Sequence, residues 1–147
     1  MQGLTRVIAA ALMGACASLS AAQGAETGEP FQMIHPASET ALEDWLWIKR
    51  PVVVFADNAA DPRYVEQMKL ISDRLAALED RDVVVITDTD PAARSSVRQA
   101  LRPRGFMLVV IAKDGSIVIR KPGPWSEREI SRSIDKLPLR QQEIRDR

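Results

Sequence analysis

The sequence predicts a single domain of the α/β class, in which helices cover a mixed sheet. Two valine-rich runs, residues 52–56 and 83–86, are each followed by an aspartate, a proline and apolar residues at helical spacing. A third apolar run, residues 106–112, leads through Asp114-Gly115 into another strand pattern, which is typical of a hairpin. The 147 residues are enough to enclose one core without disulfide bonds.

The charge balance excludes two classes of function. Lysine and arginine together number 20, as do aspartate and glutamate, so the formal net charge is zero. Neither a basic nucleic-acid binder nor an acidic disordered tail is therefore expected. Hydrophobic residues make up 46% and charged residues 27%, which is typical of a globular protein.

Residues 1–22 have the pattern of a signal peptide. Arg6 is their only charge, and Val7 to Leu19 form an alanine-rich apolar run that is short for a membrane span. Small side chains at Ser20 and Ala22 favour cleavage directly after Ala22, before Gln23; cleavage before Ala25 is the second choice. We therefore expect a periplasmic or secreted protein with no transmembrane segment after cleavage; an uncleaved anchor is the alternative.

The only cysteine, Cys16, lies inside this segment. Cleavage would leave a mature chain without any thiol, and so without a disulfide, a sulfenic acid or a thiolate metal ligand. The alternative is a lipoprotein signal with Cys16 acylated. The apolar run continues past Cys16, which argues against that lipid anchor.

Residues 23–38 show neither strand nor helix periodicity and are predicted to be an extended lead-in, with the domain proper over residues 39–147. His35, the only histidine, stands before Pro36, which disfavours helix. Because it lacks a second histidine or a cysteine nearby, we expect a surface loop residue rather than a zinc ligand.

A helix is predicted to begin at Thr40, with Glu43 closing a capping box. Trp47 and Arg50 follow at a spacing of three, so the guanidinium is expected to lie over the indole. These two residues could form an aromatic patch that binds a partner; half-buried packing of Trp47 on the domain is the favoured alternative. The apolar face of this helix comprises Leu42, Trp45 and Leu46.

Two strand-helix units come next. Pro51 opens a strand buried on both faces, after which Asp61 caps a long helix with Pro62 in its first turn. Asp90 and Pro91 repeat this arrangement after the second strand, before a weaker helix. The inner face of the long helix comprises Tyr64, Met68, Ile71, Leu75 and Leu78. Two such units in succession imply a right-handed parallel crossover.

The third and fourth strands form the predicted hairpin, whose Asp114-Gly115 turn suits positive φ at both residues. Ser126 and Glu129 form a capping box that opens a last helix, and Pro138 ends it. The resulting order, βαβαββα with a mixed four-stranded sheet and one extra helix in front, is that of a thioredoxin-like domain.

Four stretches carry a family resemblance: Trp45-Leu46-Trp47 with Arg50, Arg81 to Val85, Lys113-Asp114-Gly115, and Ile134 to Arg145. On them the chain resembles the bacterial domain of unknown function 4174, over about Leu42 to Arg145. Leucine and isoleucine stand where that family typically has methionines around the proline of the closing segment. The family is similar to the peroxiredoxin-like domain of some secreted animal matrix proteins, which implies the fold and says little about activity.

Thioredoxin-like enzymes place their reactive cysteines between the first strand and the first helix, where a helix N-terminus stabilises a thiolate. Residues 57–61 occupy that place here and contain no sulfur. The usual proline before the third strand would fall near Met107, and Pro103 comes about four residues too early. The chain is therefore predicted to be neither a disulfide oxidoreductase nor a thiol peroxidase.

Acidic residues follow the first two predicted strands: Asp57 and Asp61 after one, Asp88 and Asp90 after the other. Neighbouring parallel strands would bring them to one edge of the sheet, where ligands of α/β proteins bind, and Ca²⁺ or Mg²⁺ prefers such oxygens. The favoured alternative makes Asp61 and Asp90 helix caps and the other two solvated loop residues.

The closing segment offers a charged tail with Arg140, Glu143 and Arg145 beside two apolar residues. It either docks onto a partner or covers the end of its own sheet, and the second is favoured because two apolar side chains make too small an anchor.

We expect an exported thioredoxin-like module without thiol redox activity or cofactor, which binds another envelope protein or has a structural role there. The sequence contains no Gly-x-Ser-x-Gly elbow and no phosphate-binding glycine loop. The alternative is a metal-dependent or acid/base enzyme that uses the aspartates at the strand ends.

Overall fold

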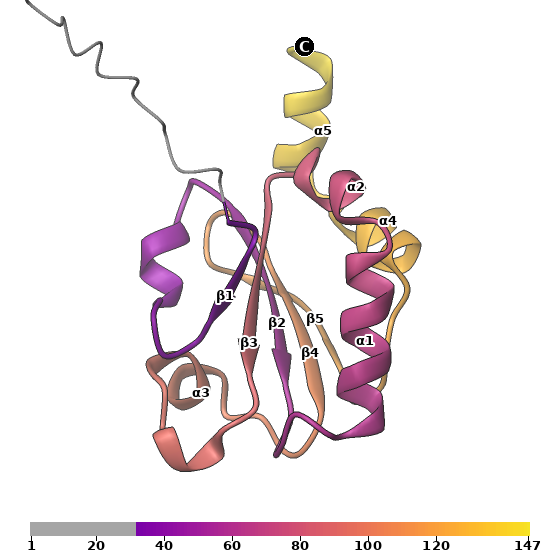
Figure 1. Ribbon diagram of the computed structural model, residues 1–147. Coiled ribbons are helices and arrows are strands. Elements are labelled where there is room, and N and C mark those ends of the chain that lie inside the picture. Colours follow the sequence, from indigo (N-terminus) through magenta and orange to yellow (C-terminus); the bar gives the residue numbers. More distant parts are fainter. Residues whose placement is uncertain (1–31) are drawn as a thin grey trace, which may run out of the picture. The chain divides into compact units, whose positions relative to one another are not determined.

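The computed structural model describes residues 32–147, which form a five-stranded mixed sheet with helices on both faces (Figure 1). The spatial order of the strands is β1-β3-β2-β4-β5; β1 and β2 run parallel to β3, whereas β4 is antiparallel to both β2 and β5. The strands are β1 Ile34–Pro36, β2 Arg50–Phe55, β3 Val83–Asp88, β4 Met107–Ile111 and β5 Ile117–Lys121. The predicted signal peptide and Cys16 lie outside the described residues.

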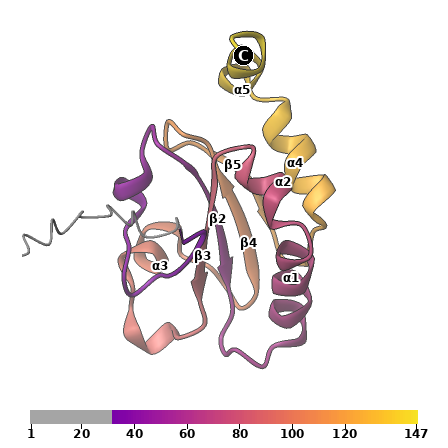
Figure 2. The same ribbon diagram turned by 45° about the horizontal axis from the view of Figure 1, so that its top comes forward.

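The helices form two layers. The first comprises α1 Pro62–Ser72, α2 Leu75–Glu79 and α4 Glu127–Asp135, which cover one face of the sheet (Figure 2). The second comprises α3 Ser96–Leu101 and the 3-10 helix η1 Leu42–Trp45 on the opposite face. A 3-10 turn, η2 Pro91–Ala93, precedes α3, and α5 Pro138–Arg145 closes the chain. No helix within residues 32–147 combines the length and apolar character that a bilayer span requires.

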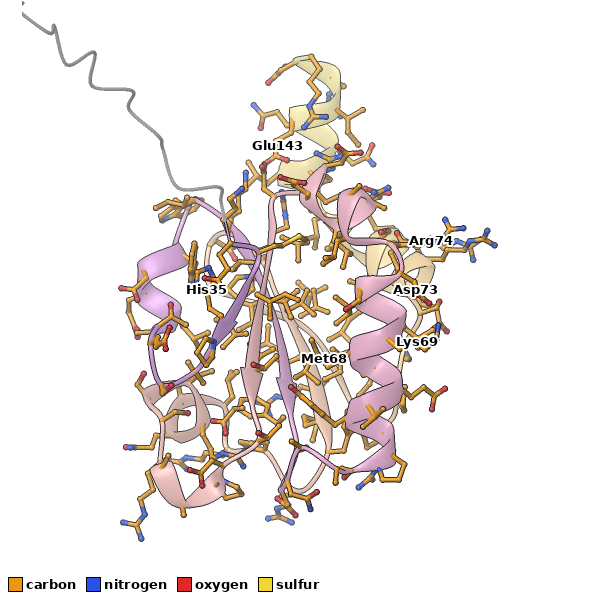
Figure 3. The ribbon with its side chains drawn as sticks, in the orientation of Figure 1. His35, Met68, Lys69, Asp73, Arg74 and Glu143 are labelled. Carbon is orange, nitrogen blue, oxygen red and sulfur yellow. The ribbon has the colours of Figure 1, made fainter. Side chains whose placement is uncertain are left out.

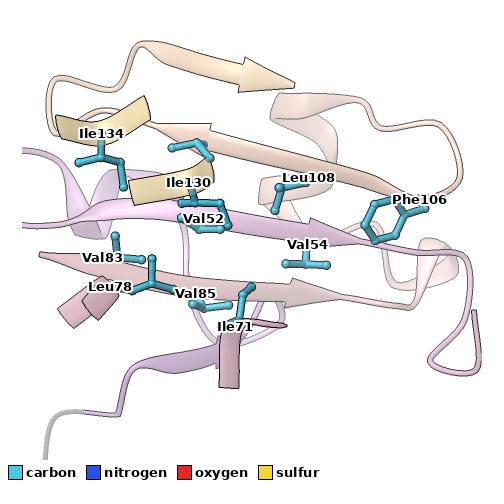
Figure 4. Close-up of a cluster of buried hydrophobic side chains, with 11 residues drawn as sticks. Val52, Val54, Ile71, Leu78, Val83, Val85, Phe106, Leu108, Ile130 and Ile134 are labelled. Atoms are coloured by element: carbon cyan, nitrogen blue, oxygen red, sulfur yellow. The ribbon is translucent and has the colours of Figure 1, made fainter. Parts of the chain in front are cut away.

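Strand alternation builds a core on each face. Val52 and Val54 point toward α1, α2 and α4, and Val53 and Phe55 point toward α3 and η1. All four are fully buried, as expected of the central strand in a sheet with helices on both faces. Figure 4 shows the first core, in which Ile130 and the other helix residues close over the valines.

The predicted four-stranded sheet is wrong by one strand. β1 lies in the stretch predicted to be an extended lead-in and pairs with β3 from Ile34 opposite Val85 to Pro36 opposite Thr87. Three residues are too few to show a period of two, so the strand leaves no signal in the sequence. His35 is part of this strand, with its ring centre 5.1 Å from that of Trp45.

Three predicted helices are shorter than expected. The helix expected from Thr40 is a single 3-10 turn, and Asp44 rather than Glu43 accepts the hydrogen bond that caps it, from the Ala41 N–H at 2.8 Å. The long helix after β2 breaks at Asp73 and Arg74 into α1 and α2, and Leu78 of α2 lies in the core, as its place on the predicted inner face expects. The helix expected after Asp90 consists of η2 and α3.

The hairpin differs in its turn. Ala112 donates its N–H to the Ser116 carbonyl at 2.8 Å, enclosing a three-residue loop in which only Gly115 has positive φ. This is the loop length in which a glycine after a type I turn restores the strand direction. The parallel pairing of β2 with β3, the Asp61 cap of α1 and the Ser126–Glu129 capping box of α4 are confirmed.

Candidate functional site

The carboxyl ends of β2 and β3, where a thioredoxin-like enzyme carries its thiols, hold instead the loop of residues 57–61 and the start of α1. Asp57 is exposed, whereas the Asp61 carboxylate accepts the Arg63 N–H at 2.9 Å and so caps α1. The side-chain hydrogen bond from Arg63 holds the pKa of Asp61 below its usual range. Asp61 therefore has a structural role at this end of the sheet.

Asp88 at the end of β3 is buried and is not a solvated loop residue. Its carboxylate accepts hydrogen bonds from Ser95 Oγ at 2.6 Å and Arg98 Nη2 at 2.8 Å. Burial raises the pKa of Asp88, but the hydrogen bonds from Arg98 and Ser95 outweigh it and lower the pKa overall. Arg98 also donates to the carbonyls of Ala56 and Asp88, so this ion pair fastens β2 to β3.

The four aspartates do not form a single cluster of ligands. Asp90 caps η2 by accepting the Ala92 N–H at 3.1 Å, and Asp88 is engaged by Arg98. Among residues 32–147, no three histidine, cysteine, aspartate or glutamate side chains lie close enough together to hold a metal ion. An open concavity of about 670 Å³ adjoins Asp88 and Asp90, lined largely by serine, threonine and acidic residues.

The opposite end of the sheet, where β2 begins, carries an exposed aromatic side chain. Trp47 is 64% exposed and has a left-handed backbone with φ of 64°, which is rare for a bulky residue. Its N–H donates to the carbonyl of Lys113 in the β4–β5 turn at 2.7 Å. The expected half-buried packing of Trp47 is therefore wrong.

An apolar groove of about 270 Å³ lies beside Trp47, between η1 and the β4–β5 turn. Leu46 forms part of its wall and is 43% exposed, and Ile48 next to Trp47 is 60% exposed. Adjacent exposed apolar side chains beside a groove are typical of protein interaction sites. We call Leu46, Trp47 and Ile48, together with this groove, the apolar surface.

Arg50 does not stack on Trp47. It is the first residue of β2 and is fully buried, and its guanidinium donates to the Arg81 carbonyl at 2.8 Å and to Glu143 Oε1 of α5 at 3.0 Å. Lys113 Nζ donates to the same Glu143 oxygen at 2.8 Å, and Arg140 Nη1 reaches the other oxygen at 3.4 Å. Three cations thus surround the carboxylate of Glu143, whose position is labelled in Figure 3.

Further ion pairs extend this arrangement. Lys113 Nζ lies 2.8 Å from Asp82, and Arg81 pairs with Asp135 through two hydrogen bonds of 3.0 and 2.8 Å. The ion cluster, as we call it, comprises Lys49, Arg50, Arg81, Asp82, Lys113, Asp135, Arg140 and Glu143. Burial raises the pKa of Glu143, but hydrogen bonds from Lys113 and Arg50 outweigh it and lower the pKa to about 2.

The closing segment therefore binds to its own domain through the ion pairs of Arg140 and Glu143, as the favoured interpretation expected. Arg145 is exposed. Sequence reasoning did not identify Lys113, Asp82 or Asp135 as partners of these residues. One signal was present: a charged residue, Arg50, stands at the head of a fully apolar strand and needs a buried partner. The four stretches that carry the family resemblance all contribute to the ion cluster or the apolar surface.

Comparisons with known proteins agree with this fold. The chain is similar to the reduced 2-Cys peroxiredoxin of Plasmodium vivax, with 12% identity, a TM-score of 0.56, and coverage of 69% of this chain and 84% of that chain. It is also similar to thioredoxin peroxidase I of Plasmodium yoelii, with 15% identity, a TM-score of 0.54, and coverage of 70% and 80%. At such identities the similarity shows the fold alone. No curated protein matches the sequence.

The family comparison covers most of the chain. Residues 41–143 match the family described as Domain of unknown function (DUF4174), a range that includes the groove, the ion cluster and both ends of the sheet. The only cysteine of the sequence lies before this range, at position 16. The chain therefore belongs to the DUF4174 family and has a thioredoxin-like fold.

Proposed function

We propose that this protein is an exported binding module on a thioredoxin-like fold, without thiol chemistry, whose apolar surface binds another protein of the bacterial cell envelope. The observation that carries the proposal is Trp47, exposed in a left-handed backbone between two other exposed apolar residues. Strained residues persist where function or surrounding structure requires them, and tryptophan is among the commonest residues to dominate a protein interface.

The chemistry of the partner follows from the surroundings of Trp47. The apolar groove favours an apolar side chain, and Lys49, which belongs to the ion cluster, lines this groove. The partner segment we propose therefore carries an apolar residue next to acidic ones, so that its charge complements this end of the domain.

Export and the lack of thiol chemistry belong to the same proposal. The signal-peptide pattern of residues 1–22 supports a periplasmic or secreted location, and a mature chain that begins at Gln23 would contain no cysteine. Mass analysis of the exported form should find this N-terminus. The enzyme alternative lacks comparable support, because Asp61, Asp88 and Asp90 are each engaged by groups of their own chain.

Photo-crosslinking tests the proposal. A photoreactive residue at position 48 in the exported protein should give one discrete crosslinked product in the native cell. The product should disappear in Trp47→Ala and persist in Trp47→Phe, with Tm unchanged because the indole is largely exposed. Val65 on α1, 55% exposed, is the matched control position and should give no such product. A product from both positions, or one that survives Trp47→Ala, would contradict the proposal.

A further inference from the structure

The carboxylate of Glu143 is held as a bound ligand would be. Two of its cations come from other elements, Arg50 from β2 and Lys113 from the β4–β5 turn, and both reach the same oxygen, at 3.0 and 2.8 Å. Arg140, three residues before Glu143 on α5, faces the second oxygen. Convergence of an arginine and a lysine from separate elements on one carboxylate is the usual geometry of an oxyanion site.

Glu143 does not use all the donors around it. The side chains of Arg50 and Arg140 are 1% and 6% exposed; the Nε atom of Arg50 is buried without a hydrogen-bond partner, whereas Arg140 Nε lies 3.5 Å from Asp135 Oδ1. A buried N–H without an acceptor is unfavourable, so Arg50 keeps a donor that Glu143 does not satisfy.

Helix α5 is attached to the domain largely through polar groups. Leu139 and Ile144, its two apolar residues of large size, are 37% and 46% exposed, so little apolar area holds the helix in place. The Glu143 side chain is itself 21% exposed. In Figures 1 and 2, α5 extends beyond the sheet rather than lying along either face. Glu143 is thus placed where its side chain can exchange with solvent while the core stays intact.

We infer that Arg50, Lys113 and Arg140 form a carboxylate-binding site, which Glu143 fills in the free protein and an external carboxylate fills when Glu143 turns away. The external group is either an acidic side chain of a protein or a small organic acid. This inference is independent of the apolar surface, because it depends only on the ion cluster and would stand if Trp47 bound nothing.

Chemical rescue of Glu143→Ala tests the inference. The substitution removes the internal carboxylate and leaves room for acetate. At pH 7 and equal ionic strength, about 100 mM acetate should raise the Tm of this variant by several degrees more than chloride does, because a ligand that binds only the folded state stabilises it. The wild-type protein, in which Glu143 competes for the site, should show a smaller difference between the two salts.

Asp73→Ala is the matched control, since it also removes a carboxylate partner of a lysine, but on the outer side of α1 (Figure 3). It should respond equally to acetate and chloride. If Glu143→Ala is unfolded in chloride, refolding by acetate, followed by circular dichroism, is the equivalent result. An equal response to both salts, or a chain that stays unfolded in both, would overturn the inference.

A second measurement separates the two sources of the carboxylate. The affinity of Glu143→Ala for a blocked tetrapeptide that contains one glutamate is compared with its affinity for acetate. Tighter binding of the peptide, by about tenfold or more, assigns the site to a protein side chain, because the peptide adds contacts beyond the carboxylate. Equal binding assigns it to a small organic acid. The double variant Glu143→Ala/Lys113→Met should lose the response to both.

Discussion

Asp88 and Arg98 lie next to residues 57–61, the segment that holds the reactive groups in thioredoxin-like enzymes, and their contacts are those of a structural pair. Arg98 donates to Asp88 and to carbonyls of both central strands, and its guanidinium lies 5.3 Å from the centre of the Phe55 ring. With side chains 12% and 4% exposed, the pair closes the end of the sheet. Its removal should therefore affect stability.

Asp88→Ala should lower the free energy of unfolding by about 3–5 kcal/mol, because it leaves the Arg98 charge buried without its partner. Urea unfolding at neutral pH measures the change. Arg63→Ala is the control: it breaks the Arg63–Asp61 pair, in which Arg63 is 52% exposed, and should cost less than about 1 kcal/mol. Similar small losses in both variants would show that the buried pair adds no stability.

Single residues were the least predictable level from sequence. Gln67 looks like a surface residue of α1, but it is fully buried and pairs with the backbone N–H and carbonyl of Trp125 at 2.8 and 2.9 Å. Helical spacing identifies the face of α1 on which Gln67 lies. It does not identify Trp125, 58 positions away, as the partner, because that contact depends on how α1 meets the loop before α4. The caps at Asp61 and Asp90 were predictable because both partners lie within two residues.

At the scale of elements, the β4–β5 turn connects the hairpin to the apolar surface. Gly115 has φ of 85°, and a Cβ there would lie 3.2 Å from Leu46 Cδ1, in the wall of the groove. The backbone requires the glycine, and a Cβ there would also have to displace the terminal methyl of Leu46, which directly follows η1. Lys113 in the same turn reaches Glu143, so this turn also borders the ion cluster.

Gly115→Ala should lower the free energy of unfolding by more than the 1–2 kcal/mol that a left-handed backbone alone costs, about 2–3 kcal/mol, because Leu46 must also shift. Gly105→Ala isolates the backbone cost, since Gly105 has φ of 59° and nothing within 4 Å of a Cβ. Gly123→Ala, with neither constraint, should be neutral or slightly stabilising. Thermal unfolding of the three variants should give this order, and equal losses at positions 105 and 115 would contradict the role of Leu46.

Most elements were predictable because their signals are local. The valine runs, the aspartate-proline caps and the Asp-Gly turn each depend on a few neighbouring residues, and they suffice for the order of strands and helices. The missing strand, β1, and the break between α1 and α2 have no local signal. β1 exists because of its tertiary pairing with β3, whereas nothing in the structure explains the helix break.

For the whole molecule, the two ends of the sheet have different characters. The carboxyl ends of β2 and β3 carry helix caps and the Asp88–Arg98 pair, and the end where β2 begins carries the apolar surface and the ion cluster. The sequence placed its ligand and metal candidates at the first end because ligands of α/β folds commonly bind there, and it offered Trp47 with Arg50 and the charged tail as two separate candidates for binding a partner. The second end joins residues from positions 49 to 143, and no spacing in the sequence indicates that they meet.

The ion cluster makes the stability of the whole domain sensitive to acid. Glu143 has a folded-state pKa of about 2 against an ordinary value of 4.5, and burial, which opposes this shift, is outweighed by Lys113 and Arg50. Hydrogen bonds from Arg81 likewise outweigh burial and lower the pKa of Asp135. Because these pKa values are lowered on folding, the stabilisation is complete above the ordinary value and is lost as the pH falls toward 2.

Urea unfolding between pH 7 and pH 2 should therefore show a stability that is nearly constant down to about pH 5 and then falls, with Glu143 contributing on the order of 3 kcal/mol to the decline. Glu143→Gln should be less stable than wild type at neutral pH and should approach it as the pH falls through 2, where the wild-type carboxyl becomes neutral. Asp73→Asn, from an exposed pair, should follow the wild-type curve throughout. Parallel curves for wild type and Glu143→Gln would mean that acid acts on the domain through other carboxylates.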